Sequence, residues 1–260
     1  MAVAHALMSP EAKPAVARAA WLWVHEAAPP DAVAVAAFLS EERVYEAFVS
    51  VPGPGPSKDT RSCVAALRDR GIRVSALGGD PSWVDGQGAL RWMERAVGGL
   101  AFDAVHLDIE PWGTADWAGN DARMLAGLER AVREVAAHTE LPVEVDLVPW
   151  LAETHPSAFL RIASAADAVT LMAYRDRADD IFAVSSAARA LLRRAGRPYR
   201  IGVETGPVRH PAPSARETFA DDGRAAMDAA LADVAAGIDP RDRFDGFAVH
   251  DAEGWAALQA

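Results

Sequence analysis

The stretch FDAVHLDIEPW, residues 102–112, combines the alternation of a buried strand with a row of ionisable side chains. Its aliphatic positions alternate with His106, Asp108 and Glu110, and successive side chains of a strand point to opposite faces. One face of this strand is therefore apolar and the other is ionisable. Buried ionisable groups cost free energy unless they are paired or solvated. The ionisable face predicts a solvated or ligand-binding site rather than a dry core.

Short apolar runs like this one recur along the chain and alternate with longer amphipathic stretches. Eight runs predict strands, near residues 20–26, 43–51, 73–79, 104–110, 143–149, 168–174, 199–205 and 244–251. Several of the stretches between them show the i, i+3, i+4 spacing of a one-sided helix. Eight strand–helix units predict a single-domain α/β protein, a (β/α)₈ TIM barrel, with a doubly wound open sheet as the alternative.

The N-terminal segment is Ala-rich and precedes the first predicted strand. Residues 1–17 are predicted to be a loose lead-in, and residues 18–260 the barrel domain. The segment has no basic leader region, and Glu11 and Lys13 interrupt its apolar run, so we expect neither a signal peptide nor a membrane span. These features favour a cytoplasmic protein.

Charge and cysteine content exclude several classes of function. The formal net charge is −11 at pH 7 and the basic residues are scattered. Nucleic-acid-binding and peripheral membrane proteins usually present a basic face, so both are disfavoured. The single cysteine, Cys63, allows no intrachain disulfide and no cysteine-based zinc site. We expect it to be a small core residue.

Polar residues fall late in the predicted strands, on the side that a barrel turns toward its axis. Near the carboxyl end of each strand, axis-facing positions open into the active site of this fold. The alternation of side chains along these strands, which we call strand parity, gives an inward set of seven residues: His25, Asp108, Glu110, Asp146, Tyr174, Glu204 and His250. Carboxyl, imidazole and phenol groups are those that enzymes use for acid–base chemistry. We expect the seven side chains to converge on one cavity.

Tryptophans accompany these positions. The chain contains eight, and five lie near predicted strand ends: Trp23, Trp83, Trp112, Trp150 and Trp255. Packing in the core or rim is the ordinary interpretation of any one of them. As a group, they suit stacking against the flat apolar faces of sugar rings or another planar ligand.

The opening stretch resembles a known signature. FDAVHLDIEPW is similar to the fourth-strand pattern D-G-x-D-x-D-x-E of the family 18 (chitinase-like) glycoside hydrolases. Asp103, Asp108 and Glu110 match its first Asp, third Asp and Glu, whereas Ala104 replaces the Gly and His106 the second Asp. LMAYRD, residues 171–176, resembles the sixth-strand M-x-Y segment. The resemblance covers about residues 20–258. Segments such as SALGGDPSW and GFAVHD resemble those of an uncharacterised bacterial branch of these barrels.

The resemblance implies a mechanism and a set of site residues. In the family, the matched Glu is the general acid/base, and the third Asp orients a 2-acetamido group whose carbonyl oxygen is the nucleophile. The Tyr of M-x-Y supports that group. Glu110, Asp108 and Tyr174 are therefore expected to be catalytic on a sugar-like substrate. Because His106 replaces an Asp of the signature, the carboxylate expected beside Asp108 is missing and the charge coupling at Asp108 differs from that in the family. The resemblance therefore does not imply specificity for chitin. Substrate binding is assigned to Trp23, His25, His106, Asp146, Glu204, His250, Trp112 and Trp255.

Three alternatives remain open. Glu204, after the seventh strand, stands where the large retaining glycosidase clan carries a protein nucleophile, and the carboxyl separation distinguishes that route. A metal-dependent hydrolase or isomerase could draw ligands from the same histidines and carboxylates. However, no H-x-H or H-E-x-x-H motif occurs, and we predict no metal and no cofactor. The third is a non-catalytic barrel that binds a sugar or small metabolite.

Overall fold

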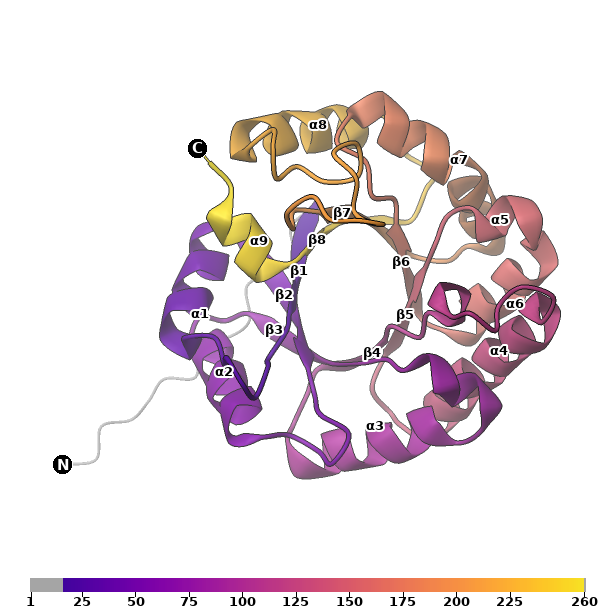
Figure 1. Cartoon of the computed structure of the whole chain (residues 1–260), viewed down its shortest axis with the longest axis horizontal. Helices are drawn as coiled ribbons and strands as arrows, with labels where there is room; N and C mark the ends of the chain where they lie inside the picture. The colour runs from indigo at the N-terminus through magenta and orange to yellow at the C-terminus, as the bar shows by residue number, and fades with distance from the viewer. Residues whose placement is uncertain (1–15, 260) are drawn as a thin grey trace.

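The computed structural model of the protein describes residues 16–259. Eight parallel strands pair in chain order and close into a barrel, with β8 pairing back onto β1. Figure 1 looks along the barrel and shows the helices as a ring around it. The prediction of a single-domain (β/α)₈ barrel is confirmed.

The elements alternate with few exceptions. The strands are β1 (Ala17–Leu22), β2 (Val44–Ser50), β3 (Arg73–Gly78), β4 (Ala104–Leu107), β5 (Val143–Leu147), β6 (Ala168–Met172), β7 (Tyr199–Glu204) and β8 (Phe244–His250). The α-helices are α1 (Ala32–Glu41), α2 (Lys58–Arg68), α3 (Gly88–Gly99), α4 (Asp121–Ala137), α5 (Leu151–Thr154), α6 (Pro156–Ala165), α7 (Ala178–Ala195), α8 (Arg224–Gly237) and α9 (Ala252–Ala257). Two short 3₁₀ helices, η1 (Pro81–Asp85) and η2 (Pro111–Gly113), follow β3 and β4.

The first strand differs from its prediction. It begins and ends earlier than residues 20–26, so Trp23 and His25 follow the strand instead of lying in it. Pairing with β2 and β8 on both sides overrides the weak strand propensity of the alanines at its start. The lead-in predicted for residues 1–17 lies outside the described residues except for its last two positions, and Ala17 already belongs to β1. The expected absence of a signal peptide, and the cytoplasmic location, stay predictions.

Side-chain caps and one glycine set several helix ends. The Asp31 carboxylate accepts from the backbone N–H groups of Val33 and Ala34 to begin α1, and the Ser57 hydroxyl accepts from Thr60 N–H to begin α2. Gly196 ends α7 with φ 62°, a left-handed conformation that favours glycine. Within residues 16–259, no helix combines the length and apolarity that a bilayer crossing requires.

Cys63 lies inside α2, where its side chain is fully buried against the barrel. Burial, together with the nearby Asp59 carboxylate, raises the pKa of the Cys63 thiol to about 11. The thiol is therefore neutral at physiological pH, in agreement with the expected role as a small core residue.

Two kinds of packing fill the molecule. The main core lies between the strands and the helix ring, and every strand contributes apolar side chains to it. A much smaller apolar cluster lies inside the barrel and consists of Ala19, Trp21, Phe48, Leu77 and Ala248. The remaining axis-facing positions are largely polar, so the barrel interior is the part of the fold that carries the ionisable residues.

A glycine pair at the end of β3 positions the start of the site. The Asp108 N–H donates to the Gly78 carbonyl over 2.9 Å, which extends the pairing of β3 and β4 beyond Leu107. A Cβ atom on Gly79 would lie 1.7 Å from the Asp108 carbonyl oxygen. The close approach of the two chains therefore requires glycine at residue 79 and holds the backbone of Asp108 in place.

Candidate active site

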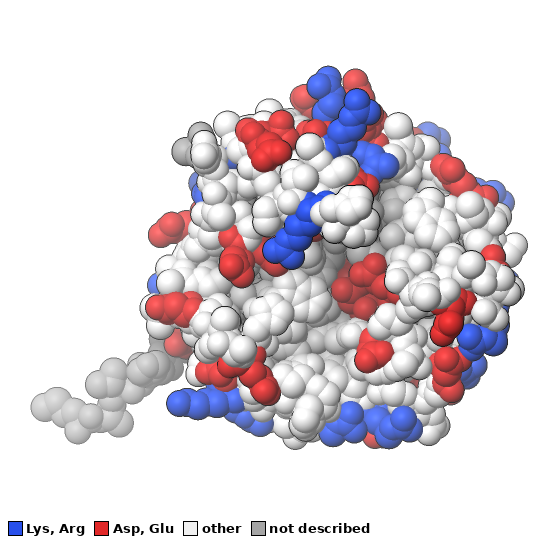
Figure 2. Space-filling model, viewed as in Figure 1, with Lys and Arg blue, Asp and Glu red and all other residues white. Residues whose placement is uncertain are grey.

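Five of the seven predicted inward residues come together at the carboxyl ends of the strands. They are Asp108 and Glu110 after β4, Tyr174 after β6, Glu204 ending β7 and His250 ending β8. The Tyr174 and His250 rings lie with their centroids 5.9 Å apart. Figure 2 shows that this face of the molecule is hollowed at the centre and that acidic side chains lie in the hollow. The mouth of the barrel is therefore the candidate active site.

Asp108 and Glu110 form a coupled pair of carboxyl groups. Burial, and then the Asp146 and Glu110 carboxylates, raise the pKa of Asp108 well above its usual range. Burial also raises the pKa of Glu110, although a hydrogen bond from Trp112 opposes the rise. The pKa is thus raised at both residues. The larger rise falls on the deeper Asp108, because it is more enclosed and lies nearer to Asp146.

The side chain of Glu110 is held by a residue that follows it closely in sequence. The indole N–H of Trp112 donates to Glu110 Oε2 over 3.0 Å. Pro111 is the first residue of η2, so the chain turns directly after Glu110 and brings the indole back to the carboxylate. By contrast, the Oδ1 atom of Asp108 is buried and has no hydrogen-bond partner among residues 16–259. Tyr174 therefore makes no hydrogen bond to this oxygen.

Tyr174 lies in the field of several carboxyl groups. Burial, and then the charges of Asp108, Asp146 and Glu204, raise the pKa of Tyr174 well above its usual range. The phenol therefore stays protonated and can donate to a ligand that enters the mouth.

Glu204, His250 and Trp23 form a hydrogen-bonded chain on the opposite side of the mouth. His250 Nδ1 lies 2.9 Å from Glu204 Oε2, and the Trp23 indole N–H donates to His250 Nε2 over 3.1 Å. Because an indole only donates, His250 Nε2 accepts and its Nδ1–H donates to Glu204. Burial alone would lower the pKa of His250, but the bond to Glu204 outweighs burial and raises it.

Both oxygens of Glu204 are already occupied. Oε2 accepts from His250, and Oε1 accepts from the backbone N–H groups of Thr205 and Gly206 over 2.8 and 2.6 Å. A cavity of about 630 Å³ adjoins this side of the mouth, between the segment after β7 and α9, and Glu204 and His250 line it. Its size suits a sugar unit or a similar small ligand.

His106 and Asp146, both predicted to bind substrate, lie one layer deeper and are fully buried. His106 Nε2 is 2.8 Å from Asp146 Oδ1, and His106 Nδ1 is 3.4 Å from Glu144 Oε2. Burial alone would lower the pKa of His106, but Asp146 and then Glu144 outweigh it and raise the pKa to about 10. The imidazole is therefore a buried cation, stacked on Phe48 with ring centroids 3.8 Å apart. The substrate-binding prediction is corrected for both residues: they are sealed from the mouth.

Asp146 supplies a second carboxylate close to Asp108, on the strand next to the one that carries His106. It projects from β5 and is one of the two charges that raise the pKa of Asp108. Asp146 also accepts from the Trp21 indole over 3.3 Å. The carboxylate next to Asp108 therefore comes from the neighbouring strand, β5, and it is paired with the His106 cation.

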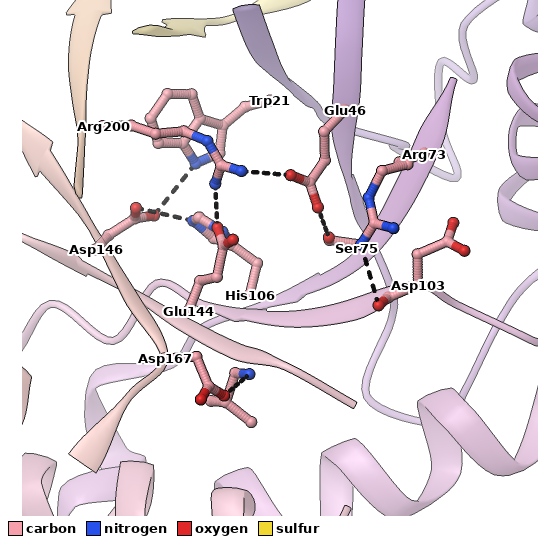
Figure 3. Close-up of polar contacts among 11 residues, drawn as sticks. Trp21, Glu46, Arg73, Ser75, Asp103, His106, Glu144, Asp146, Asp167 and Arg200 are labelled. Atoms are coloured by element: carbon pink, nitrogen blue, oxygen red, sulfur yellow. Dashed lines mark hydrogen bonds and ion pairs between the residues drawn. The ribbon is translucent and has the colours of Figure 1, made fainter. Parts of the chain in front are cut away.

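Sequence reasoning missed a buried ion-pair network below His106. Arg200 pairs with Glu144 and, over 2.5 Å, with Glu46, and the Ser75 hydroxyl donates to Glu46 over 2.6 Å. Figure 3 shows the Arg200 guanidinium between the two carboxylates. Burial alone would raise the pKa of Glu144, but Arg200 and His106 outweigh it and lower the pKa to about 2. Applying the parity argument to β2 and to the start of β7 would have identified Glu46 and Arg200.

Two predicted binding residues do not reach the mouth. His25 is exposed in the turn after β1, where its backbone bridges to Ala28. Trp255 is fully buried in α9, where its ring contacts Phe38 of α1 at a centroid distance of 5.6 Å. Strand parity could not place these residues, because both lie outside the strands. The prediction is corrected for both: His25 belongs to the rim outside the barrel, and Trp255 to the packing of the helix layer.

Three of the four imidazole nitrogens at the site make hydrogen bonds, and the fourth, His106 Nδ1, lies at ion-pair distance from Glu144. His106 contacts Asp146 and Glu144, and His250 contacts Glu204 and Trp23. Over residues 16–259, no cluster of three or more histidine, cysteine or carboxylate side chains is arranged to hold a metal ion. The arrangement instead offers proton-holding carboxyl groups and hydrogen-bond donors.

Comparisons with known proteins establish the fold. No family model matches the chain, and no curated protein matches it in sequence. A β-1,3-glucanosyltransferase from Rhizomucor miehei matches with a TM-score of 0.58 and 11% identity, covering 90% of this chain and 86% of that one. A putative deoxyribose-phosphate aldolase from Toxoplasma gondii matches with a TM-score of 0.57 and 15% identity, covering 93% and 94%.

A third match is the spore cortex-lytic enzyme SleL from Bacillus cereus, with a TM-score of 0.52 and 11% identity. It covers 83% of this chain, which spans 57% of the length of SleL. At these identities the likeness shows the barrel fold alone. Carbohydrate-active enzymes share this fold with an aldolase, so the function has to be argued from the site.

Proposed function

We propose that the protein is a glycoside hydrolase-like enzyme that uses Asp108 and Glu110 as its acid/base pair on a sugar substrate. One observation carries this proposal: two neighbouring carboxyl groups at the barrel mouth both have raised pKa values. Perturbed carboxyl groups in a concave site are typical of general acids. A carboxylic acid that remains protonated near neutral pH can donate to the oxygen of a leaving alcohol.

The two carboxyl groups have different parts in this proposal. Asp108 holds the shared proton in the resting enzyme, because burial and Asp146 disfavour its ionised form more strongly. Glu110 is the later residue and precedes the turn at Pro111, so it is the one that meets the substrate. The proton passes from Asp108 to Glu110 and from Glu110 to the glycosidic oxygen as the bond to the leaving group breaks.

The occupied oxygens of Glu204 favour the substrate-assisted route over a protein nucleophile. Three donors hold this carboxylate, and a nucleophilic attack would have to break at least one of these bonds. Asp108 and Tyr174 lie where a 2-acetamido group could be oriented, as the resemblance implies. This route predicts cleavage of N-acetylated sugars in preference to sugars with a free 2-hydroxyl.

The structural neighbours add support of a general kind. One of them is a glucanosyltransferase in complex with laminaritriose, and another is a cortex-lytic enzyme. An aldolase-like reaction through a lysine Schiff base is disfavoured, because the chain has only two lysines, Lys13 and Lys58. Lys58 begins α2 in the helix ring, and Lys13 lies outside the described residues.

The test compares Glu110→Gln with the wild type on 4-methylumbelliferyl β-glycosides of N-acetylglucosamine, chitobiose, glucose and mannose. We expect a loss of turnover of about 10²-fold or more, because the amide keeps the shape but cannot donate the proton. Glu94→Gln on the exposed face of α3 is the matched control and should retain full turnover. Full activity of Glu110→Gln would refute the assignment, and absence of cleavage of all four glycosides by the wild type would favour a non-catalytic sugar-binding barrel.

Tyr174→Phe tests the second part of the proposed site. Removing the hydroxyl deletes a donor from the mouth, so turnover should fall by about tenfold, as expected for the loss of one hydrogen bond to a polar group. Thermal unfolding should change little, since the ring remains beside His250. Unchanged turnover on the substrate identified above would remove Tyr174 from the mechanism.

A further inference from the structure

Trp150 is an unusual residue on the surface of this protein. Large hydrophobic side chains are exposed at four described positions, Val16, Val33, Trp150 and Val208, and Trp150 is the aromatic one. It is 40% exposed and directly follows Val148 and Pro149 at the carboxyl end of β5. An exposed indole leaves a large apolar area in water without contributing to the core. Its position beside the mouth points to contact with a ligand.

Two further tryptophans support the Trp150 ring. Trp112 lies 6.5 Å from it between ring centroids, at an interplanar angle of 79°, and Trp117 lies 6.1 Å from it at 77°. Both partners are partly buried and pack against the main core. Such edge-to-face contacts hold aromatic rings in a defined orientation. We call Trp112, Trp117 and Trp150 the aromatic platform.

The backbone beneath Trp150 is also well anchored. Its carbonyl oxygen accepts from the backbone N–H groups of Glu153 and Thr154, both over 3.1 Å, and from the Thr154 hydroxyl over 3.1 Å. The exposed ring therefore stands on a rigid turn. A rigid aromatic surface loses little conformational entropy when a ligand stacks on it.

The aromatic platform is joined directly to the proposed general acid. The Trp112 indole that packs against Trp150 also donates to Glu110 Oε2 over 3.0 Å. A ligand that stacks on Trp150 is therefore separated from Glu110 by one side chain, that of Trp112. The platform extends the site from the ends of β4 and β5 toward the outside of the barrel.

The charges around the platform restrict the ligand. Asp116 and Glu153 are exposed close to it in sequence, and Asp121 pairs with His155, whose ring contacts Trp117 at 6.1 Å. With Glu110 on the other side, carboxylates border the platform, and they disfavour an anionic ligand. Carboxylates do accept hydrogen bonds from the hydroxyl groups of a neutral sugar.

We infer that the aromatic platform is a subsite for a neutral hexopyranose unit of a β-linked oligosaccharide, adjacent to the sugar whose glycosidic bond Glu110 protonates. All-equatorial β-linked units present the flat C–H faces that stack on an indole. The substrate is therefore an oligosaccharide rather than a single sugar or small metabolite. The position relative to the bond rests on the proposed function, whereas binding to the platform does not.

The experiment measures binding by calorimetry and by tryptophan emission in the Glu110→Gln background, which prevents cleavage. The probes are cellotetraose, laminaritetraose, mannotetraose and chitotetraose, with glucose as the monosaccharide. We expect at least one tetrasaccharide to bind and to change the emission, and glucose to bind far more weakly. Trp150→Ala should weaken binding by about tenfold or more, as for an aromatic hot spot. Trp150→Phe should retain most of the affinity.

Val33→Ala is the control, because Val33 is also an exposed hydrophobic side chain but lies on α1, which contacts α2, α9 and β2 rather than the platform. Its affinity should equal that of the parent. The inference is overturned if no tetrasaccharide binds, if Trp150→Ala binds as tightly as the parent, or if that variant changes only the oligomeric state in sedimentation. Binding without any cleavage by the wild type would refute the proposed function and leave the subsite standing. Cleavage of a tetrasaccharide that is unaffected by Trp150→Ala would support the proposed function and refute the subsite.

Discussion

Two layers of ionisable side chains lie one above the other on the barrel axis, and they differ in how their charges are paired. The sealed layer consists of Glu46, His106, Glu144, Asp146 and Arg200, and the mouth layer of Asp108, Glu110, Tyr174, Glu204 and His250. Both layers use the same alternate positions of the strands. Both also contain three carboxyl groups and one histidine, so the presence of these residue types does not distinguish them.

The sealed layer combines opposite charges. Arg200 contacts two carboxylates, and the His106 cation lies between two carboxylates. All five residues are buried, and each ionised group has a partner within hydrogen-bond or ion-pair distance. Such a layer stays ionised near neutral pH, because each charge is stabilised by its partner.

In the mouth layer Glu204 is paired with His250, but like charges meet at Asp108 and Glu110. Asp108 and Glu110 face each other and Asp146, one Asp108 oxygen has no partner, and the pKa values of both carboxyls are raised. These groups hold protons that a substrate can take. The comparison indicates that pairing, rather than the presence of acids in a barrel, separates a structural charge from a catalytic one.

The largest expected effect is the removal of the central cation of the sealed layer. Arg200→Leu leaves Glu46 and Glu144 buried without their shared partner, so the free energy of unfolding should fall by about 3–5 kcal/mol in urea denaturation. Arg241→Ala is the control, because the Arg241 side chain is largely exposed and the loss of its pair with Asp239 should change the free energy of unfolding far less. Equal effects of the two changes would mean that the sealed layer is no more important than a surface pair.

A smaller and pH-dependent effect is expected at His106. Its folded pKa of about 10 exceeds the ordinary value of 6.5, so its stabilising contribution is complete below pH 6.5 and is lost as the pH rises toward 10. The wild type should exceed His106→Gln by about 1.5–3 kcal/mol near pH 6, the range for hydrogen bonds to charged groups. Denaturation at several pH values between 6 and 10 measures this difference.

His138→Gln provides the comparison for that series, since His138 is exposed at the end of α4. Its difference from the wild type should remain flat over the same range. A constant gap between His106→Gln and the wild type from pH 6 to 10 would show that His106 is neutral in the folded protein.

The smallest expected effect has the opposite sign and belongs to the mouth layer. The folded pKa of Asp108 is raised above its unfolded value, so folding disfavours its ionisation and the wild type loses stability as the pH rises above the unfolded pKa. Asp108→Asn removes this cost, so the variant should match the wild type near pH 4 and exceed it in Tm at higher pH, while turnover falls. A variant that is less stable than the wild type at pH 7 would place Asp108 with the structural charges.

Sequence patterns predicted much of this molecule. Apolar runs predicted eight strands, and alternation along six of them predicted the side that faces the axis and identified Asp108, Glu110, Tyr174, Glu204 and His250 within an inward set of seven. The extent of β1 was wrong because its pairing with β2 and β8, rather than its own residues, sets its ends. Trp23 still faces the barrel interior although it follows the strand, because it lies two residues after Trp21 and packs against the same inner cluster.

The amino-acid sequence by itself determined which side chains point toward the barrel axis, because the alternation of a strand has a period of two and is local to each strand. Only the tertiary structure decided the depth at which they lie. Depth depends on the stagger between strands, which places His106 beside Glu144 and Thr170 beside Arg200. That stagger seals His106 and Asp146 beneath the mouth and leaves Asp108 and Glu110 at its opening, and no single strand carries that information.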